Sequence, residues 1–455
     1  MEAKAFVEEL IVKARQAQSA YETFTQEQAD KIVRACAKAV YDNAEYLARL
    51  AVDETRMGVY EHKIQKNKGK AKVIWNSLKG KKSVGILSRN EETGITEIAR
   101  PVGVVGAVTP CTNPVVTPMC NAMFALKGLN AIIIGPHPRA KKTSYETVRL
   151  MNEAIEKLGA PSNLIQIIEE PTVELSAALM HAVDVVVATG GMPMVRSAYS
   201  SGKPAYGVGA GNVQCIFDRG IDYEKEIPMA IEGRAFDNGI ICSGEQTAIL
   251  PAEDYDKAVE IFVKNGCYYV SAEEEVQRLT DTLFPGGVMN KNLVGVSAMQ
   301  IAKAAGLCVP EGTKGILVKA PAYGKECLLS KEKMCPVISA YSYGDFSEAV
   351  DIAQANLNVE GRGHSVSIHS DNKEHIEYAG ERLTVSRLLV NQICSTMNGG
   401  SFFNSLTPTT TLGCASWGNN SISENFSYKF LLNVIRIAYR LNDAAVPTDE
   451  EIWAD

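Results

Sequence analysis

A chain of 455 residues is too long for a single hydrophobic core, so two or three domains are expected. Its formal net charge of −7 argues against nucleic acid or an anionic membrane as a partner. No apolar stretch reaches membrane-spanning length, and the N-terminus lacks a signal-peptide pattern. The eleven cysteines include no Cys-x-x-Cys pair, which predicts reduced thiols in the cytoplasm and neither a disulfide framework nor a metal site.

The first hundred residues predict helices followed by a hairpin. The N-terminus alternates charged and apolar residues as an amphipathic helix does, and residues 26–54 carry apolar side chains at three- and four-residue spacing. Thr25 and Gln28 form a capping box in front of that helix. Two β-rich segments, 83–87 and 95–100, flank a polar stretch and predict a β-hairpin.

From residue 101 onward, short apolar runs alternate with helical patterns in two blocks. The first block predicts strands at 102–108, 131–135, 164–168 and 184–189. It predicts helices at 118–126 and 173–181, and between them a further helix that Thr143 and Glu146 cap. The second predicts strands at 247–250, 315–319, 336–342, 364–369 and 387–391, and helices at 223–236, 254–265, 346–355 and 373–379. Such uniformly apolar strands indicate parallel sheets covered on both faces. The boundary is expected near 211–222, and an apolar helix is expected at 428–439.

Cys242 and Asn113 are candidate catalytic residues. Cys242 lies in a glycine-flanked turn, residues 238–246, where a thiolate could attack a carbonyl and form a thioester. The local sequence leaves a buried structural cysteine as an equal alternative, because free cysteines are often buried. Asn113 follows a predicted strand, where its amide could donate to an oxyanion, although Asn before Pro is also ordinary turn chemistry.

Three other segments are rich in glycine or in basic residues. Residues 189–191 (Thr-Gly-Gly) could bring a cofactor close to a helix N-terminus, or could form a plain strand-to-helix turn. The basic loop, residues 135–142 (Gly-Pro-His-Pro-Arg-Ala-Lys-Lys), could bind a phosphate or could be a solvated basic cap. The stretch 207–212 has no ionisable group and alone indicates a flexible linker or a tight turn.

Taken in chain order, these segments resemble the CoA-acylating branch of the aldehyde dehydrogenase superfamily over essentially the whole chain. The matching segments are Gly103-Val104-Val105-Gly106 with Asn113, Pro136-His137-Pro138-Arg139, Thr189-Gly190-Gly191, Cys242, Glu332-Lys333-Met334-Cys335-Pro336-Val337, Gly361-Arg362-Gly363-His364 and Thr411-Leu412-Gly413-Cys414-Ala415-Ser416-Trp417-Gly418. So many ordered matches exclude chance agreement.

The resemblance implies an α/β fold of the aldehyde dehydrogenase type, with two doubly wound parallel-sheet domains and a small β oligomerisation element. Residues 1–215 are expected to bind the cofactor, and 216–406 to carry the nucleophile. Residues 407–455 are expected to return to the cofactor domain and to the oligomerisation element, which includes the hairpin at 83–100. A homodimer that acts on small molecules is expected, with no nucleic-acid or membrane partner.

The resemblance also implies roles for individual residues. Cys242 is the nucleophile, Asn113 and the Cys242 backbone N–H stabilise the oxyanion, and His364 is an acid–base or CoA-contacting group. The expected cofactor contacts are Thr109, Pro110, His137, Arg139, Thr189, Gly190, Gly191 and Glu332. NADP(H) is the preferred cofactor, because the cations of the basic loop could bind its 2′-phosphate. NAD(H) is the alternative, and coenzyme A is the co-substrate.

The expected acyl acceptor follows from one position that differs from the family pattern, and the expected substrate from two short matching segments. Hydrolytic relatives carry a glutamate base where this chain has Gly207, so the thioester is expected to pass to CoA rather than to water. Residues 235–239 and 419–425 resemble the subgroup that reduces succinyl-CoA to succinate semialdehyde, with Arg362 and Ser243 as candidates for binding the substrate carboxylate. An acetaldehyde- or butyraldehyde-forming enzyme of the same branch, or a non-enzymatic protein of the same fold, are the alternatives.

Overall fold

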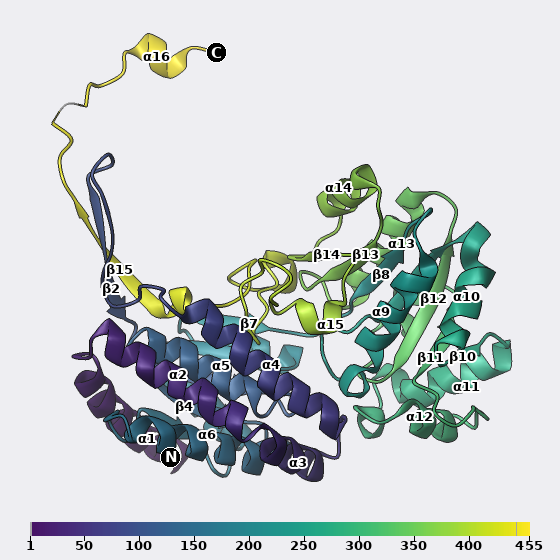
Figure 1. Ribbon diagram of the computed structural model, residues 1–455, viewed down its shortest axis with the longest axis horizontal. Helices are drawn as coiled ribbons and strands as arrows, with labels where there is room; N and C mark the ends of the chain where they lie inside the picture. The colour runs from purple at the N-terminus through teal and green to yellow at the C-terminus, as the bar shows by residue number, and fades with distance from the viewer. Residues whose placement is uncertain (1, 443) are drawn as a thin grey trace.

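The computed structural model describes residues 2–442 and 444–455. Two parallel sheets with helices packed on them form the body of the molecule, and a three-stranded antiparallel sheet projects from it (Figure 1). The predicted α/β fold with two parallel sheets and a small β element is therefore confirmed. No helix in the described part of the chain is both long and apolar enough to cross a membrane.

The first sheet has the strand order β5-β4-β3-β6-β7, and all neighbouring strands are parallel. Its strands are β3 Val104–Thr109, β4 Ala131–Pro136, β5 Ile165–Ile167, β6 Val185–Thr189 and β7 Ala205–Val208. Its helices are α1 Glu2–Tyr21, α2 Gln26–Asp42, α3 Ala44–Thr55, α4 Tyr60–Leu78, α5 Val116–Lys127, α6 Lys141–Glu156, α7 Val173–Ala182 and α8 Met192–Tyr199. All residues of β3 and β4 are buried, because α1 and α7 pack on one face of the sheet and α5 and α6 on the other.

The N-terminal helices follow the sequence pattern in part. The capping box of Thr25 and Gln28 is confirmed, but the helical region 26–54 is divided at Asn43 into α2 and α3. The predicted cap of Thr143 with Glu146 is wrong, because α6 begins two residues earlier. A carboxylate from α3, that of Glu54, accepts the N–H groups of residues 142 and 143 instead, each at 2.8 Å.

The second sheet has seven parallel strands in the order β10-β11-β12-β9-β8-β13-β14. They are β8 Gln214–Phe217, β9 Thr247–Pro251, β10 Cys267–Val270, β11 Gly315–Lys319, β12 Val337–Tyr343, β13 Val366–His369 and β14 Leu388–Val390. The helices are α9 Tyr223–Ala235, α10 Tyr255–Lys264, α11 Glu273–Leu283, α12 Ala298–Ala304, α13 Phe346–Val359, α14 Lys373–Arg382 and α15 Cys394–Met397. The division predicted after residue 215 falls within β8, so the chain crosses from one sheet to the other at residues 209–213.

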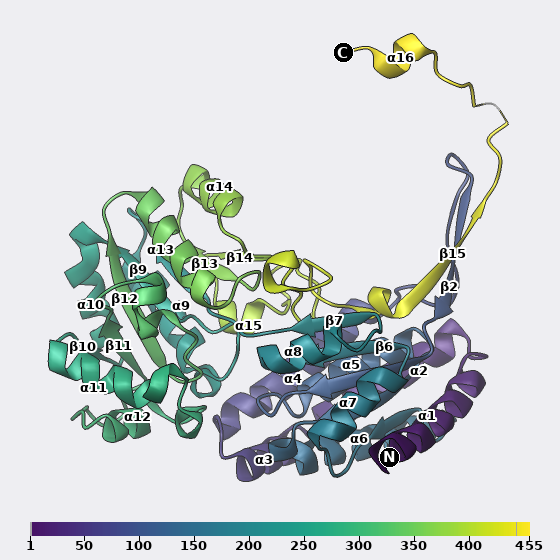
Figure 2. The same ribbon diagram turned by 180° about the vertical axis from the view of Figure 1, so that it is seen from behind.

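The small sheet joins the predicted hairpin to the C-terminal tail. Strands β1 (Gly85–Asn90) and β2 (Ile95–Pro101) form the hairpin, and β15 (Leu432–Ala438) pairs antiparallel with β2. The apolar helix predicted at 428–439 is therefore wrong: one 3₁₀ turn leads into a strand, because the backbone of this segment pairs with β2. Beyond the sheet, α16 (Asp449–Trp453) lies far from the body of the molecule (Figure 2).

Asn130 ties the start of this tail to the first sheet. The side chain is fully buried, and its Oδ1 accepts from the N–H groups of Val102 at 2.7 Å and Gly103 at 2.9 Å. Its Nδ2 donates to the carbonyl oxygens of Ala125 at 3.1 Å and Leu431 at 2.9 Å. One amide thus joins the beginning of β3, the end of α5 and the residue before β15.

We expect Asn130→Ala to lower the free energy of unfolding by about 2–4 kcal/mol, because two backbone N–H groups and two carbonyl oxygens lose their hydrogen bonds to this buried amide. Chemical denaturation of the purified protein measures the change. Asn358→Ala, at an exposed position on α13, is the control and should stay within about 0.5 kcal/mol of the wild type. Equal losses in the two variants would show that Asn130 is not an anchor of the tail.

Candidate active site

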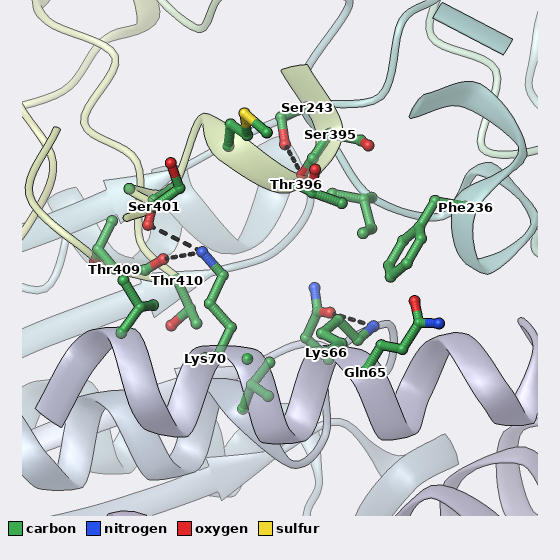
Figure 3. A pocket seen from close by; sticks show the side chains of 18 of the residues that line it. Gln65, Lys66, Lys70, Phe236, Ser243, Ser395, Thr396, Ser401, Thr409 and Thr410 are labelled. Atoms are coloured by element: carbon green, nitrogen blue, oxygen red, sulfur yellow. Dashed lines mark hydrogen bonds between the residues drawn. The ribbon is translucent and has the colours of Figure 1, made fainter. Parts of the chain in front are cut away.

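A cavity of about 370 Å³ lies where helix α4 faces the loop before β9 (Figure 3). Cys242, Asn113 and Ser243 all line this space, which we call the Cys242 cavity. Helix α15 and residues 399–412 supply further parts of its wall. The structure therefore brings Asn113 together with Cys242 and Ser243, which lie about 130 residues further along the chain.

The loop that carries Cys242 begins where helix α9 ends. Asp237 and Asn238 have φ angles of 52° and 53°, a left-handed conformation that non-glycine residues rarely adopt. From the other side Gly211 presses on the loop, since a Cβ there would lie 1.9 Å from the Cys242 carbonyl oxygen. The glycine-rich stretch 207–212 is therefore not a flexible linker: it ends β7 and packs directly against the nucleophile loop.

Arg234, near the end of α9, holds this loop through a buried guanidinium. The group donates to five carbonyl oxygens, those of Gly239, Gly244, Glu245, Lys333 and Cys335. Three of these carbonyls bracket Cys242 in the sequence, and the other two follow Glu332. A single buried cation therefore joins the nucleophile loop to the Glu332 segment.

The Cys242 thiol lies in a largely apolar environment. It packs against the cluster of Val208, Leu412 and Cys414. Burial raises the pKa of the Cys242 thiol to about 12; the nearby carboxyl of Glu332 adds to this shift, and Arg387 opposes it. At neutral pH the Cys242 thiol is therefore protonated.

Two lysines of α4 line the same cavity and were missed by the sequence analysis. Lys66 Nζ lies 2.8 Å from Oδ1 of Asn113, and Lys70 Nζ donates to the carbonyl oxygens of Gly399 at 2.9 Å and Thr409 at 3.3 Å (Figure 3). Burial lowers the pKa of Lys70 to about 8. Their four-residue spacing places both lysines on one helix face, but no helix was predicted over 60–78, and lysines ordinarily mark a solvated face.

Of the predicted nucleotide contacts, Thr109, Pro110 and residues 189–191 lie at the carboxyl ends of β3 and β6. These neighbouring strands flank the point where the strand order of the first sheet reverses, a place where doubly wound sheets bind nucleotides. The Oγ1 atom of Thr109 is buried here without a hydrogen-bond partner among the described residues. At Gly190 and Gly191 a Cβ would meet no atom closer than 3.7 Å, so both positions leave room for a ligand. With Pro110 directly after β3, this edge fits a dinucleotide cofactor.

Glu332 reaches the same region from the second sheet. Its Oε1 accepts from the Gly211 N–H at 3.1 Å, and Gly211 in turn touches the Cys242 backbone. Burial raises the pKa of Glu332 to about 8, and the neighbouring Glu360 adds to the shift. The carboxyl therefore stays largely protonated at neutral pH, where it can offer a hydroxyl donor.

The basic loop is less cationic than its sequence indicated. His137 and Arg139 are exposed, and the His137 ring accepts from the Arg139 N–H at 3.1 Å. Lys141 pairs with Glu170. The Glu54 carboxylate occupies the helix N-terminus directly behind this loop. Only part of the positive charge of this loop is therefore available to a ligand.

The segment 361–364 lies outside the Cys242 cavity. Arg362 is exposed and does not line that cavity, whereas His364 is fully buried beside Arg387, whose guanidinium donates to the His364 carbonyl at 2.8 Å. Burial lowers the pKa of His364 to about 3, so the ring is neutral. Neither ring nitrogen has a hydrogen-bond partner within the described residues.

Comparison with known proteins agrees with this architecture. The sequence pattern of the aldehyde dehydrogenase family matches residues 2–403. The chain is 56% identical over 447 residues to a succinate-semialdehyde dehydrogenase (acetylating) from Clostridium kluyveri, covering 98% of each chain. It is 40% identical over 463 residues to an acylating sulfoacetaldehyde dehydrogenase from Bilophila wadsworthia, covering 99% of this chain and 98% of the relative.

The fold resembles that of an acetylating aldehyde dehydrogenase from Geobacillus thermoglucosidasius, with a TM-score of 0.94 and 37% identity. That match covers 98% of this chain and 99% of the other. The structure places a cysteine and a side-chain amide in one cavity, beside a sheet edge that fits a dinucleotide. The chain belongs to the aldehyde dehydrogenase family, and its relatives place it in the CoA-acylating branch of oxidoreductases.

We expect iodoacetamide to alkylate Cys242 in the ligand-free enzyme at a rate that rises about tenfold per pH unit from pH 7 to 9.5, without a plateau. The reason is that the thiolate fraction grows tenfold per unit below a pKa near 12. Mass spectrometry of the modified peptide separates this reaction from that of the exposed Cys308. A plateau below pH 8 would contradict the protonated thiol.

Proposed function

We propose that this enzyme reversibly reduces succinyl-CoA to succinate semialdehyde and CoA, with the acyl group held on Cys242 as a thioester. The observation that carries the proposal is Lys70, a cation inside the cavity that Cys242 lines. The names of two relatives support it, because succinate semialdehyde and sulfoacetaldehyde both carry an anionic group at the end opposite the carbonyl.

Lys70 takes the role that the sequence analysis gave to Arg362. Its ammonium has three N–H donors, and two of them contact carbonyl oxygens, which leaves one for a substrate carboxylate. Arg362 is exposed and does not line the cavity. Ser243 stays a second candidate, since its hydroxyl lies in the cavity wall and donates to the Ser395 carbonyl at 3.1 Å. A cation on one wall and a hydroxyl on another suit a short dicarboxylic acyl chain.

The residues of the cavity support acyl transfer through a thioester. In the reducing direction the Cys242 sulfur attacks the acyl-CoA carbonyl, whose oxygen becomes an oxyanion that the Asn113 amide and the Cys242 N–H stabilise. The carbon–sulfur bond to CoA then breaks, CoA leaves as a thiol with the proton that Cys242 gave up, and the acyl group stays on Cys242. The nicotinamide cofactor, when bound, supplies hydride in this direction and accepts it in the reverse.

Gly207 supports transfer of the acyl group to CoA instead of water. The residue lies within β7, and a Cβ there would meet Val195 at 2.8 Å and Tyr199 at 3.0 Å. The Gly207 N–H donates to the Tyr199 hydroxyl at 2.9 Å. The space that a glutamate base would need is therefore filled by other side chains, and no carboxylate is supplied from this position to activate water.

We propose NADP(H) as the preferred cofactor, with NAD(H) as the alternative. The exposed side chains of His137, Arg139 and Lys142 support binding of a 2′-phosphate. The Glu54 carboxylate behind them opposes it. Thr109, Pro110, residues 189–191 and Glu332 are proposed to contact the nicotinamide half of either cofactor, because they surround the reversal point of the first sheet and the nucleophile loop.

The proposed organisation follows the sheets. The first sheet with its helices, up to residue 208, binds the cofactor, and the second sheet, from residue 214 to 406, carries the nucleophile. Residues 407–455 return to the first sheet and to the antiparallel sheet, where β15 pairs with β2. We propose that this sheet joins two chains in a homodimer, because it projects from the body and leaves Ile435 and Ile437 exposed.

The free thiols of all eleven cysteines support a reducing, cytoplasmic location. His364 keeps its predicted role as an acid–base or CoA-contacting group.

We expect Lys70→Met to lower kcat/KM for succinyl-CoA by about 10–100-fold and for butyryl-CoA by less than about threefold, because a charge-assisted hydrogen bond to a carboxylate contributes about 1.5–3 kcal/mol. Following absorbance at 340 nm with NADPH and with NADH measures both losses and decides the cofactor preference. Lys68→Met, on another face of α4 where Lys68 pairs with Glu45, is the matched control. Equal losses of kcat/KM on the two substrates would show that Lys70 does not bind the substrate carboxylate.

The same lysine predicts a pH effect in the wild type. Lys70 loses its charge as pH rises through about 8, so KM for succinyl-CoA should rise above that pH while KM for butyryl-CoA stays flat.

We expect turnover with succinate semialdehyde and NADP⁺ to stop, without CoA, after roughly one equivalent of reduced cofactor per active site. The reason is that general-base assistance contributes about 10²–10⁴-fold, and none is supplied at Gly207. Rapid-mixing absorbance measures the burst, and mass spectrometry detects the acyl group on Cys242. The variant Cys242→Ala is the control and should give no burst. Sustained formation of succinate without CoA would contradict the acylating assignment.

A further inference from the structure

Lys66 contacts two residues that come from different parts of the chain. Its Nζ lies 2.8 Å from Oδ1 of Asn113 and 2.6 Å from Oδ2 of Asp237. Asn113 follows β3 of the first sheet, whereas Asp237 belongs to the loop that leads to Cys242. Lys66 therefore links the oxyanion donor to the nucleophile loop.

The contact with Lys66 decides which way the Asn113 amide faces. An ammonium group has only donors, so the atom of the amide that faces it must be the oxygen. The Nδ2 atom then points elsewhere, and among the described residues it has one long contact, 3.4 Å to the Thr112 hydroxyl. Its N–H groups therefore remain available to an oxygen in the Cys242 cavity, which Asn113 lines.

Asp237 keeps Lys66 in this position. Its carboxylate is fully buried and also contacts Lys63 at 3.1 Å and the Val59 N–H at 2.8 Å. Burial alone would raise the pKa of Asp237, but the two lysines lower it to about 2, so it is an anion at all working pH values. This charge balances one lysine, and the cluster retains a positive charge beside Asn113.

The cluster also supports the unusual backbone before Cys242. The Asp237 N–H donates to Nδ1 of His62 at 2.9 Å, and the His62 ring stacks on Phe236 with centroids 4.7 Å apart. The partners of this left-handed residue all come from one element: His62, Lys63 and Lys66 lie in helix α4, and Val59 directly precedes it. Helix α4 therefore sets the positions of the nucleophile loop and of the oxyanion donor together.

We propose that Lys66 is a positioning residue for acyl transfer in both directions: it turns the N–H groups of Asn113 toward the reacting carbonyl and strengthens them as donors to the oxyanion. A cation on the amide oxygen draws electron density away from the amide nitrogen, which makes its hydrogens better donors. The role concerns the oxyanion, so it applies to every acyl group and does not depend on the proposed succinyl specificity or on Lys70.

The test is a double-mutant cycle of Lys66→Met and Asn113→Ala in the full-length enzyme. We expect Lys66→Met to lower kcat by about 10–100-fold with succinyl-CoA and with butyryl-CoA alike, while KM for each acyl-CoA and for the cofactor stays within about threefold. In the Asn113→Ala background the same substitution should change kcat by less than about threefold, because its target is gone. Lys66→Arg should recover most of the activity, and Lys68→Met should leave it unchanged.

Three outcomes would overturn the proposal. Multiplicative losses in the two backgrounds would show that Lys66 acts independently of Asn113, and a loss confined to succinyl-CoA would make Lys66 a carboxylate ligand. An unchanged kcat in Lys66→Met would show that Lys66 has no role in the reaction. If Lys66→Met does not fold, as judged by circular dichroism, Lys66→Gln takes its place in the cycle. Its amide can still donate to Asn113 but carries no charge, so a loss of at least about threefold that vanishes in Asn113→Ala is expected.

Discussion

The buried guanidinium of Arg234 is the interaction on which the active site depends. A guanidinium carries five donors in a fixed plane, and here they are used on carbonyl oxygens from two loops. Removing the group would leave several buried carbonyls without a donor in the place where the Cys242 loop meets the Glu332 segment. Arg234 therefore fixes the Cys242 loop through the loop's backbone carbonyls, and the Cys242 side chain remains available for chemistry.

Around this fixed loop the cavity combines a neutral nucleophile with cationic walls. The Cys242 thiol is protonated because its surroundings are apolar, whereas Lys66 and Lys70 keep donors directed at carbonyl oxygens or at Asn113. Negative charge that develops on a substrate is thus met by N–H groups already in place, which costs little reorganisation. The thiol is buried by Val208, Leu412 and Cys414 on one side of the cavity, and α4 supplies the lysines on another.

Residues with a local signature could be predicted from the sequence, and residues defined by distant contacts could not. Most strands of the two parallel sheets, the hairpin and the candidate Cys242 were recognisable because apolar runs and glycine-flanked turns are local, whereas β7, β8 and β10 were not predicted. Lys66 and Lys70 were missed because their partners come from segments tens to hundreds of residues away. The same reason explains two of the errors in secondary structure: Glu54 caps α6 from another helix, and the segment 432–438 becomes a strand only because β2 lies beside it.

The pairing of β15 with β2 also fixes the order in which the molecule can be completed. More than 300 residues separate the two strands in the sequence, so the third strand of the antiparallel sheet is made only after both parallel sheets have left the ribosome. Until then β1 and β2 form an isolated ribbon, an arrangement that is marginally stable in water. Closure of so long a loop is a late and slow event in folding. The strand β15 is therefore the last of the three strands to join the antiparallel sheet.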